Sequence, residues 1–250
     1  MMKKIITGNA NGNTFVIIEN NDYKISTNLI QELCLQYKTD ALIHLKNIHL
    51  NTLSMDYYNN DGTWETFCLN GLTCVGLILK NKFSNKSFII KCGPKKYKLN
   101  ILDDKNVRIE LPKPEYKSDK IKFDNYEGYY IDSGAKHFII NLNSSWPDNT
   151  ELVKNAQKIR YNLNKFPNGI NVNFYKVINH NTIEVITYEK GVEKLMDSCA
   201  SGSYAAAFHF HTGQNEIFII NKGGRFSVQF RSSIKKSYLL NKGQIEYTNN

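Results

Sequence analysis

Residues 67–71 read Phe-Cys-Leu-Asn-Gly, and residues 198–202 read Ser-Cys-Ala-Ser-Gly. The first element is followed by an apolar stripe with helical spacing across residues 72–79, and the second by the helix-prone run Tyr-Ala-Ala-Ala-Phe at 204–208. Both elements therefore place a cysteine just ahead of a predicted helix. About half a chain separates them, which predicts a duplicated strand–turn–helix unit, one in each of two lobes.

Cys68 and Cys199, the cysteines of these elements, occupy chemically special positions. The unpaired N–H groups and the positive dipole end of a helix N-terminus favour a thiolate. The same N–H groups suit a substrate carboxylate. Inversion at an α-carbon needs a base on one face and an acid on the other, and two thiols facing one substrate supply both. The pair predicts a cofactor-independent amino-acid racemase or epimerase.

The composition indicates one globular chain of two closely packed lobes. Its 250 residues are 41% hydrophobic and 12% aromatic, which is enough for a buried core. The polar, proline-containing segment 111–118 is the best candidate boundary. We expect an N-terminal lobe over 1–116, completed by a C-terminal strand at about 240–250, and a C-terminal lobe over 117–239.

Local patterns predict mainly short strands with a few helices. Helices are expected over 28–36 and 149–161, the latter with Asn149 or Thr150 as its N-cap. Strands are expected over 13–19, 87–90, 97–102, 107–111, 129–140, 172–177, 182–188, 216–221 and 226–230.

The net charge of +9 raises the question of nucleic-acid binding. The lysines are paired and interspersed with acids, with no basic run among aromatics, so a solvated basic surface is the preferred interpretation. No apolar window reaches the ~20 residues of a membrane helix. Five scattered cysteines are typical of free thiols in a reducing compartment. We therefore expect a cytoplasmic protein that binds neither nucleic acid nor membrane.

The remaining cysteines have a plainer interpretation. Cys34, Cys74 and Cys92 are expected to be small buried hydrophobic residues. Cys68 and Cys74 could alternatively ligate zinc, but their spacing is unusual for that, and no metal is expected. Nucleotide-binding and serine-hydrolase motifs are absent from the sequence.

Seven motifs in order across nearly the whole chain resemble those of the diaminopimelate epimerase family. Each motif alone is weak, but their order and the two cysteines make the resemblance strong. The motifs are Gly12-Asn13-Thr14-Phe15-Val16, Asn59-Asn60-Asp61-Gly62 with Cys68-Leu69-Asn70-Gly71 and Cys74, Gly134-Ala135-Lys136-His137, Asn171-Val172-Asn173-Phe174, Tyr188-Glu189-Lys190-Gly191-Val192, Cys199-Ala200-Ser201-Gly202-Ser203 and Gly223-Gly224.

The resemblance implies an α+β fold of two similar lobes, each a curved, mostly antiparallel sheet around a central helix, with the active site in the cleft between them. It implies that Cys68 and Cys199 are the acid/base groups and that His137 and Glu189 tune or orient them. A small amino acid is the expected partner, no cofactor is expected, and a homodimer is left open. The expected substrate-binding residues are Asn13, Asn59, Leu69, Asn70, Asn171, Lys190, Ala200 and Ser201, with the α-carboxylate on the N–H groups of Leu69, Asn70, Ala200 and Ser201.

Two departures from the family pattern concern the far end of the substrate. Ala135 stands where the family has an Asn, and Lys190 where it has an Arg that binds a distal carboxylate. Alanine cannot hydrogen-bond a carboxylate, and lysine lacks the two-pronged guanidinium. These departures favour a single-centre amino acid, with histidine as the best guess. Diaminopimelate itself is the alternative substrate. A non-catalytic or nucleic-acid-binding protein is the more distant one.

Overall fold

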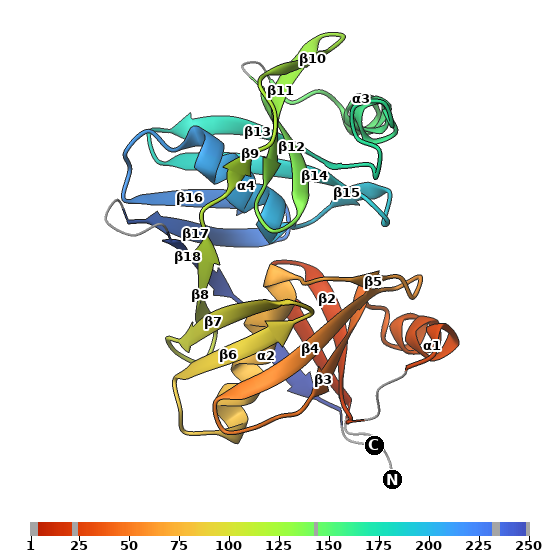
Figure 1. The fold of residues 1–250 in the computed structure, drawn as a ribbon, viewed down its shortest axis with the longest axis vertical. Coiled ribbons are helices and arrows are strands. Elements are labelled where there is room, and N and C mark those ends of the chain that lie inside the picture. Colours follow the sequence, from red (N-terminus) through yellow and green to blue (C-terminus); the bar gives the residue numbers. More distant parts are fainter. Residues whose placement is uncertain (1–4, 22–24, 143–144, 232–235, 249–250) are drawn as a thin grey trace. The chain divides into compact units, whose positions relative to one another are not determined.

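The computed structural model of the chain describes residues 5–21, 25–142, 145–231 and 236–248. It divides into two compact units (Figure 1). Unit 1 comprises Met1–Leu111 with Tyr238–Asn250, and unit 2 comprises Pro112–Ser237. Each is a mostly antiparallel sheet with two helices, which confirms the predicted α+β class. Within the described residues, no helix combines the length and apolar character needed to cross a bilayer.

Unit 1 begins with a hairpin and ends with two strands from the C-terminus of the chain. Its last strand pairs antiparallel with its first, so the two chain ends close the same sheet. In chain order its elements are β1 (Ile5–Ala10), β2 (Asn13–Glu19), α1 (Thr27–Tyr37), β3 (Ala41–Lys46), β4 (Thr52–Asn59), β5 (Trp64–Glu65), α2 (Leu69–Lys82), β6 (Ser87–Cys92), β7 (Lys95–Ile101), β8 (Asn106–Pro112), β18 (Lys236–Lys242) and β19 (Gln244–Tyr247).

Unit 2 contains the remaining elements. Two short strands precede a core that has the same order of strands and helices as unit 1. The elements are β9 (Glu115–Tyr116), β10 (Ile121–Phe123), β11 (Tyr126–Asp132), β12 (Lys136–Asn141), α3 (Asn149–Arg160), β13 (Asn171–Asn179), β14 (Thr182–Glu189), β15 (Lys194–Met196), α4 (Ala200–Phe210), β16 (Glu216–Asn221) and β17 (Gly224–Phe230).

The strand pairings show that the two units are duplicates. In unit 1, β1–β2 is antiparallel, β2–β3 parallel, β3–β4 antiparallel, β4–β6 parallel and β6–β7 antiparallel. Unit 2 repeats this order with β11–β12, β12–β13, β13–β14, β14–β16 and β16–β17. The helices occupy matching places, since α1 and α3 connect the parallel strands and α2 and α4 follow the short hairpins. The duplication inferred from the two cysteine elements is therefore present in the fold.

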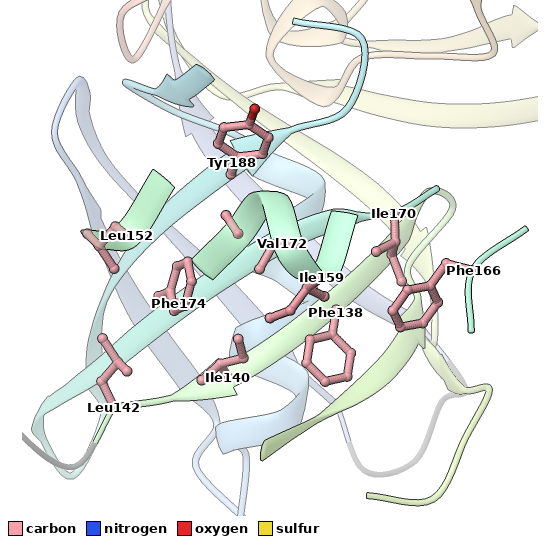
Figure 2. Close-up of a cluster of buried hydrophobic side chains, with 11 residues drawn as sticks. Phe138, Ile140, Leu142, Leu152, Ile159, Phe166, Ile170, Val172, Phe174 and Tyr188 are labelled. Carbon is pink, nitrogen blue, oxygen red and sulfur yellow. The ribbon is translucent and has the colours of Figure 1, made fainter. Parts of the chain in front are cut away.

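Each sheet is covered by one helix on one face and by the other helix on the opposite face. Successive strand residues point to opposite sides, so even and odd positions contact different helices. In unit 2, the even-numbered Phe138, Val172 and Phe174 pack against Leu152 and Ile159 of α3 (Figure 2). In unit 1, the equivalent cluster joins β2 and β3 to α1. In β2 and β3 the odd-numbered positions are consequently left for α2, and in β12 and β13 for α4.

The structure corrects two local predictions. The strand expected over 129–140 is two strands, because Ser133–Ala135 form a turn and Gly134 has a positive φ of 105°. The helix expected over 149–161 begins at Asn149, but its N-cap is Asp148, whose Oδ1 accepts from the N–H of Glu151 at 2.8 Å.

Candidate active site

Cys68 is the N-cap of α2 in unit 1. Its backbone is extended, and its Sγ accepts a hydrogen bond from the N–H of Gly71 at 3.5 Å. A cysteine here satisfies one of the helix N–H groups that have no intrahelical partner. Leu69 and Asn70, expected to hold a carboxylate with their N–H groups, are the first two residues of α2.

The Cys68 thiol also donates to Oδ1 of Asn13, at a sulfur–oxygen distance of 3.5 Å. Asn13 is buried, and its Nδ2 donates to Oδ2 of Asp40 at 3.3 Å. Because a carboxylate only accepts, Asp40 fixes the amide so that its oxygen faces the sulfur. The same carboxylate oxygen accepts from the N–H and hydroxyl of Thr14, each at 2.9 Å. The structure therefore brings two predicted site residues, Asn13 and Cys68, together.

The side chain of Asn70 is held by the C-terminal part of the chain. Its Oδ1 accepts from Nδ2 of Asn241 at 3.0 Å, and Asn241 also donates to Oγ1 of Thr73 at 2.9 Å. Sequence reasoning missed Asn241, because nothing in its own segment links it to a helix far back in the sequence. Asn59 lies at the end of β4, and its Nδ2 donates within the following turn to Oγ1 of Thr63 at 3.0 Å.

Cys199 is the N-cap of α4 in unit 2, the position that corresponds to Cys68. It is buried, with 9% of its surface exposed, and it makes no side-chain capping bond. Its Sγ lies 3.6 Å from Oγ of Ser201. Ala200 and Ser201 are the first two residues of α4, as Leu69 and Asn70 are of α2. The predicted carboxylate-binding N–H groups thus occupy matching helix starts.

His137 connects Ser201 to the interior of unit 2. It is fully buried on β12, with Nε2 3.1 Å from Oγ of Ser201 and Nδ1 3.0 Å from Nδ2 of Asn173. Burial lowers the pKa of His137 to about 3. The ring is therefore neutral at physiological pH. Asn173 also accepts through Oδ1 from the hydroxyl of Thr187 at 2.7 Å.

Sequence reasoning missed Asn173 and Thr187 as site residues. Both are fully buried polar residues on neighbouring strands, and a polar residue in an alternating strand pattern is normally expected to face solvent. Only the position of α4 over this face of the sheet reveals that they lie beneath the helix start. The one signal in the sequence was that Asn173 is the second Asn of the Asn-Val-Asn-Phe motif.

Three further predicted residues lie together where β13 begins and β14 ends. Asn171 accepts through Oδ1 from the N–H of Lys190 at 2.9 Å and donates through Nδ2 to the carbonyl of Lys136 at 3.0 Å. Glu189 is the last residue of β14, opposite Lys194 in the register. Asn171 therefore joins the start of β12 to the segment that carries Glu189 and Lys190.

The three cysteines outside the two elements are buried free thiols, as predicted. Burial raises the pKa of each, to about 12 for Cys92. They are consequently neutral, packed side chains.

Comparison with solved structures identifies the fold of the chain. A solved structure of a hydroxyproline epimerase from Agrobacterium vitis superposes with a TM-score of 0.72 at 10% identity, covering 98% of this chain and 90% of that one. At this identity the match shows the shared fold. No protein-family model matches the chain.

The sequence matches are closer. The diaminopimelate epimerase of Flavobacterium psychrophilum is 32% identical over 243 residues, which is 91% of this chain and 90% of the relative. That of Chlorobaculum tepidum is 25% identical over 241 residues, covering 91% and 93%. The chain is an isomerase of the racemase and epimerase class. It belongs to the diaminopimelate epimerase family, as its motifs indicated.

Proposed function

We propose that this protein is a diaminopimelate epimerase, which interconverts the LL and meso isomers of diaminopimelate. The observation that carries the proposal is the pair of cysteines at matching helix N-termini, in a chain whose curated relatives carry this activity in their names. The names of these relatives give no support to the histidine substrate expected from the sequence. Diaminopimelate therefore replaces histidine as the preferred substrate.

In the proposed reaction, one thiolate removes the α-proton and the opposite thiol delivers a proton to the other face. The C–H bond breaks toward one sulfur while the second S–H bond breaks toward carbon, so the pair ends with its protonation exchanged. The helix N–H groups of Leu69, Asn70, Ala200 and Ser201 hold the carboxylate as negative charge moves onto it. Because His137 is neutral, its proposed role is orientation by hydrogen bonding.

Lys190 is the proposed partner of the distal carboxylate. It keeps the positive charge of the family Arg but offers a point charge instead of a planar fork. The hydrogen bond that the backbone N–H of Lys190 donates to Oδ1 of Asn171 fixes the backbone of Lys190. We expect Asn171 and Asn59 to shape this end of the site, whereas Ala135 contributes no hydrogen bond of its own side chain.

The test is incorporation of deuterium at the α-carbon, together with chiral analysis of the products. Purified protein in D2O is given LL-diaminopimelate, L-histidine or L-proline in parallel. We expect exchange and formation of the meso isomer from diaminopimelate, with kcat/KM for the other two at least about a hundredfold lower. Faster inversion of histidine than of diaminopimelate would identify histidine as the preferred substrate and overturn the proposal of diaminopimelate.

A further inference from the structure

We propose that Asn241 is a positioning residue of the active site. Its side chain ties the start of α2, which carries the expected carboxylate-binding N–H groups, to the β1–β2 turn, which leads into Asn13. The inference deepens the proposed function and rests on it for its catalytic meaning. All of the contacts that carry it lie inside unit 1, between residues far apart in the sequence.

The amide of Asn241 uses every hydrogen-bonding position it has. The residue is buried, with 2% of its surface exposed. Its Nδ2 donates to Oδ1 of Asn70 at 3.0 Å and to Oγ1 of Thr73 at 2.9 Å. Its Oδ1 accepts from Nδ2 of Asn11 at 2.5 Å and from the backbone N–H of Lys242 at 3.0 Å. Two donors and two acceptor positions are the full capacity of an amide side chain, so its burial is compensated.

The neighbouring groups fix the direction of these bonds. The hydroxyl of Thr73 donates its hydrogen to the carbonyl of Leu69 at 3.1 Å, so its oxygen accepts from Asn241. The backbone N–H of Lys242 can only donate, which places Oδ1 of Asn241 on the opposite side of the amide. Asn241 therefore donates toward α2 and accepts from the turn. Oδ1 is consequently the atom of Asn70 that faces Asn241.

These contacts reach both segments that adjoin Cys68. On one side, Asn241 holds the first turn of α2, where the expected carboxylate-binding N–H groups lie. On the other side, Asn11 lies two residues before Asn13, whose Oδ1 is 3.5 Å from the Cys68 sulfur. A displacement of about 1 Å in a reacting group can lower a rate on the order of 100-fold. Holding the helix start against the turn therefore fixes the sulfur relative to those N–H groups.

The backbone that follows Asn241 passes closely between β1 and α2. A Cβ added at Gly243 would lie 3.2 Å from the carbonyl oxygen of Asn9 in β1 and 3.2 Å from Cγ2 of Thr73 in α2. Glycine leaves room for this approach because it has no side chain. The chain between β18 and β19 is therefore packed against both elements, which puts Asn241 within reach of each.

Unit 2 joins its equivalent segments directly. Ser133, in the turn between β11 and β12, donates through Oγ to the carbonyl of Ser201 in α4 at 2.8 Å. The turn between the first two strands of the repeat is thus tied to the start of the cysteine-capped helix in both units. In unit 1 the tie runs through Asn241. Its recurrence with unrelated side chains indicates that the connection itself is needed at these helix starts.

Unit 2 also shows what a simple anchor looks like. Tyr204 of α4 donates through its hydroxyl to the carbonyl of Pro112, at the end of β8, at 2.7 Å. At the matching position of α2, Thr73 instead meets the side chain of Asn241. A backbone carbonyl is therefore enough to anchor a strand on such a helix. The buried amide of Asn241 adds the bonds to Asn70 and to the turn, which anchoring alone does not require.

The first test measures kcat and KM for diaminopimelate in Asn241→Leu and Asn11→Gly. Leucine has a similar size but forms no hydrogen bonds, and glycine tolerates the positive φ of 52° at position 11 while removing the donor. We expect kcat to fall at least about tenfold in the first variant and about threefold in the second, with KM changed less than about threefold. The helix N–H groups matter most as charge moves onto the carboxylate, so misalignment acts mainly on kcat.

Leu79→Ala is the matched control for loss of stability. Leu79 is buried near the end of α2, away from the helix start. Urea denaturation gives the free energy of unfolding of each variant, and kinetics are compared where every variant is folded. We expect Leu79→Ala to lose comparable stability and to keep normal kcat. Normal kcat in folded Asn241→Leu would show that Asn241 is only structural. If Asn241→Leu does not fold, the same criterion applies to Asn11→Gly.

A second measurement needs no substrate and is therefore independent of the proposed function. At high pH, where the thiols are ionised, the limiting rate of alkylation by iodoacetamide reports access to each sulfur. Peptide mass spectrometry follows each cysteine separately. We expect the rate at Cys68 to rise at least about threefold in Asn241→Leu and in Asn11→Gly, and the rate at Cys199 to stay unchanged.

An unchanged Cys68 rate in both variants would overturn the proposal. Should the labelling change as expected while the unmodified protein fails to invert diaminopimelate, the positioning of Cys68 by Asn241 would stand and the proposed substrate would be wrong.

Discussion

At the scale of single residues, the two cysteines differ in their neighbours more than in their positions. Both cap a helix with an extended backbone. The sulfur of Cys68 lies between a helix N–H and an amide oxygen, whereas that of Cys199 lies beside a hydroxyl. The proposed two-base reaction needs one acid and one base at any moment, one from each helix start.

Replacing either cysteine should strongly impair inversion. We expect Cys68→Ala and Cys199→Ala each to lower kcat for diaminopimelate by at least about 10²–10⁴-fold, the usual contribution of one acid or base. Cys34→Ala is the matched control, because that thiol belongs to α1 and is buried against β2 and β3. Chiral chromatography of timed reactions measures the effect. Near-normal turnover by either variant would contradict the two-thiol scheme.

The charge at position 190 should act on substrate choice. Lys190→Gln removes an ionic partner, so kcat/KM for diaminopimelate should fall by about 10–100-fold, corresponding to ~1.5–3 kcal/mol. Lys190→Arg should keep or raise it. Iodoacetamide labelling of Cys68 and Cys199 serves as the control and should not change. Equal kcat/KM values in Gln and Lys forms would show that the distal carboxylate is bound elsewhere.

The candidate site residues that could be predicted from the sequence are those whose structural position follows from the residues next to them. Cys68 and Cys199 stand directly before helical patterns, so their capping positions could be inferred. Asn173 and Thr187 could not, because their burial depends on a helix that begins more than ten residues later in the chain. Asn241 is harder still, since it reaches Asn70 from the opposite end of the sequence.

At the scale of elements, the strand and helix pattern was largely readable. The strand β2 has the predicted bounds 13–19, because β-branched and aromatic residues end at turn-forming ones on both sides. The β11–β12 turn was missed since its apolar flanks read as one continuous run. Its glycine shows a positive φ only in three dimensions.

The matching glycines of α2 and α4 should respond differently to alanine. A Cβ at Gly202 would lie 2.0 Å from Oδ1 of the fully buried Asn173, whereas one at Gly71 would lie 2.8 Å from the terminal methyl of Ile43. A methyl end rotates away more easily than a hydrogen-bonded amide. We expect Gly202→Ala to lower the free energy of unfolding by about 2–3 kcal/mol and Gly71→Ala by about 1 kcal/mol or less.

Urea denaturation followed by circular dichroism measures both variants under identical conditions. The unmodified protein provides the reference, and equal slopes of the transitions are needed before the free energies are compared. A larger loss for Gly71→Ala would contradict the packing argument. It would place the rigid contact under α2 instead of under α4.

At the scale of the whole molecule, unit 1 is built from both ends of the chain. Its sheet contains β1 and β19 as an antiparallel pair, and β18 carries Asn241 to the start of α2. Unit 2 is contained within one continuous segment. Unit 1 therefore cannot complete its sheet until the last residues of the chain are available.

A chain that ends at residue 237 should consequently retain unit 2 and lose order in unit 1. The buried Cys74 reports this directly, because its thiol contacts the carbonyl of Gln244 at 4.0 Å and lies against Gly8. Removing 238–250 exposes that side of α2 and frees β1 on one edge. We expect Cys74 to become reactive toward a chromogenic disulfide reagent, whereas it is protected in the full chain.

Cys34 provides the internal comparison, since it lies on α1 and the buried apolar cluster around it is formed by residues of α1, β2 and β3. If unit 1 only loosens at its edge, Cys74 should react at least about tenfold faster than Cys34. If unit 1 unfolds completely, both should react alike, while the fully buried aromatic residues of unit 2 keep their near-ultraviolet circular dichroism. Continued protection of Cys74 in the truncated chain would show that β18 and β19 are dispensable, and the closing role assigned to them would be wrong.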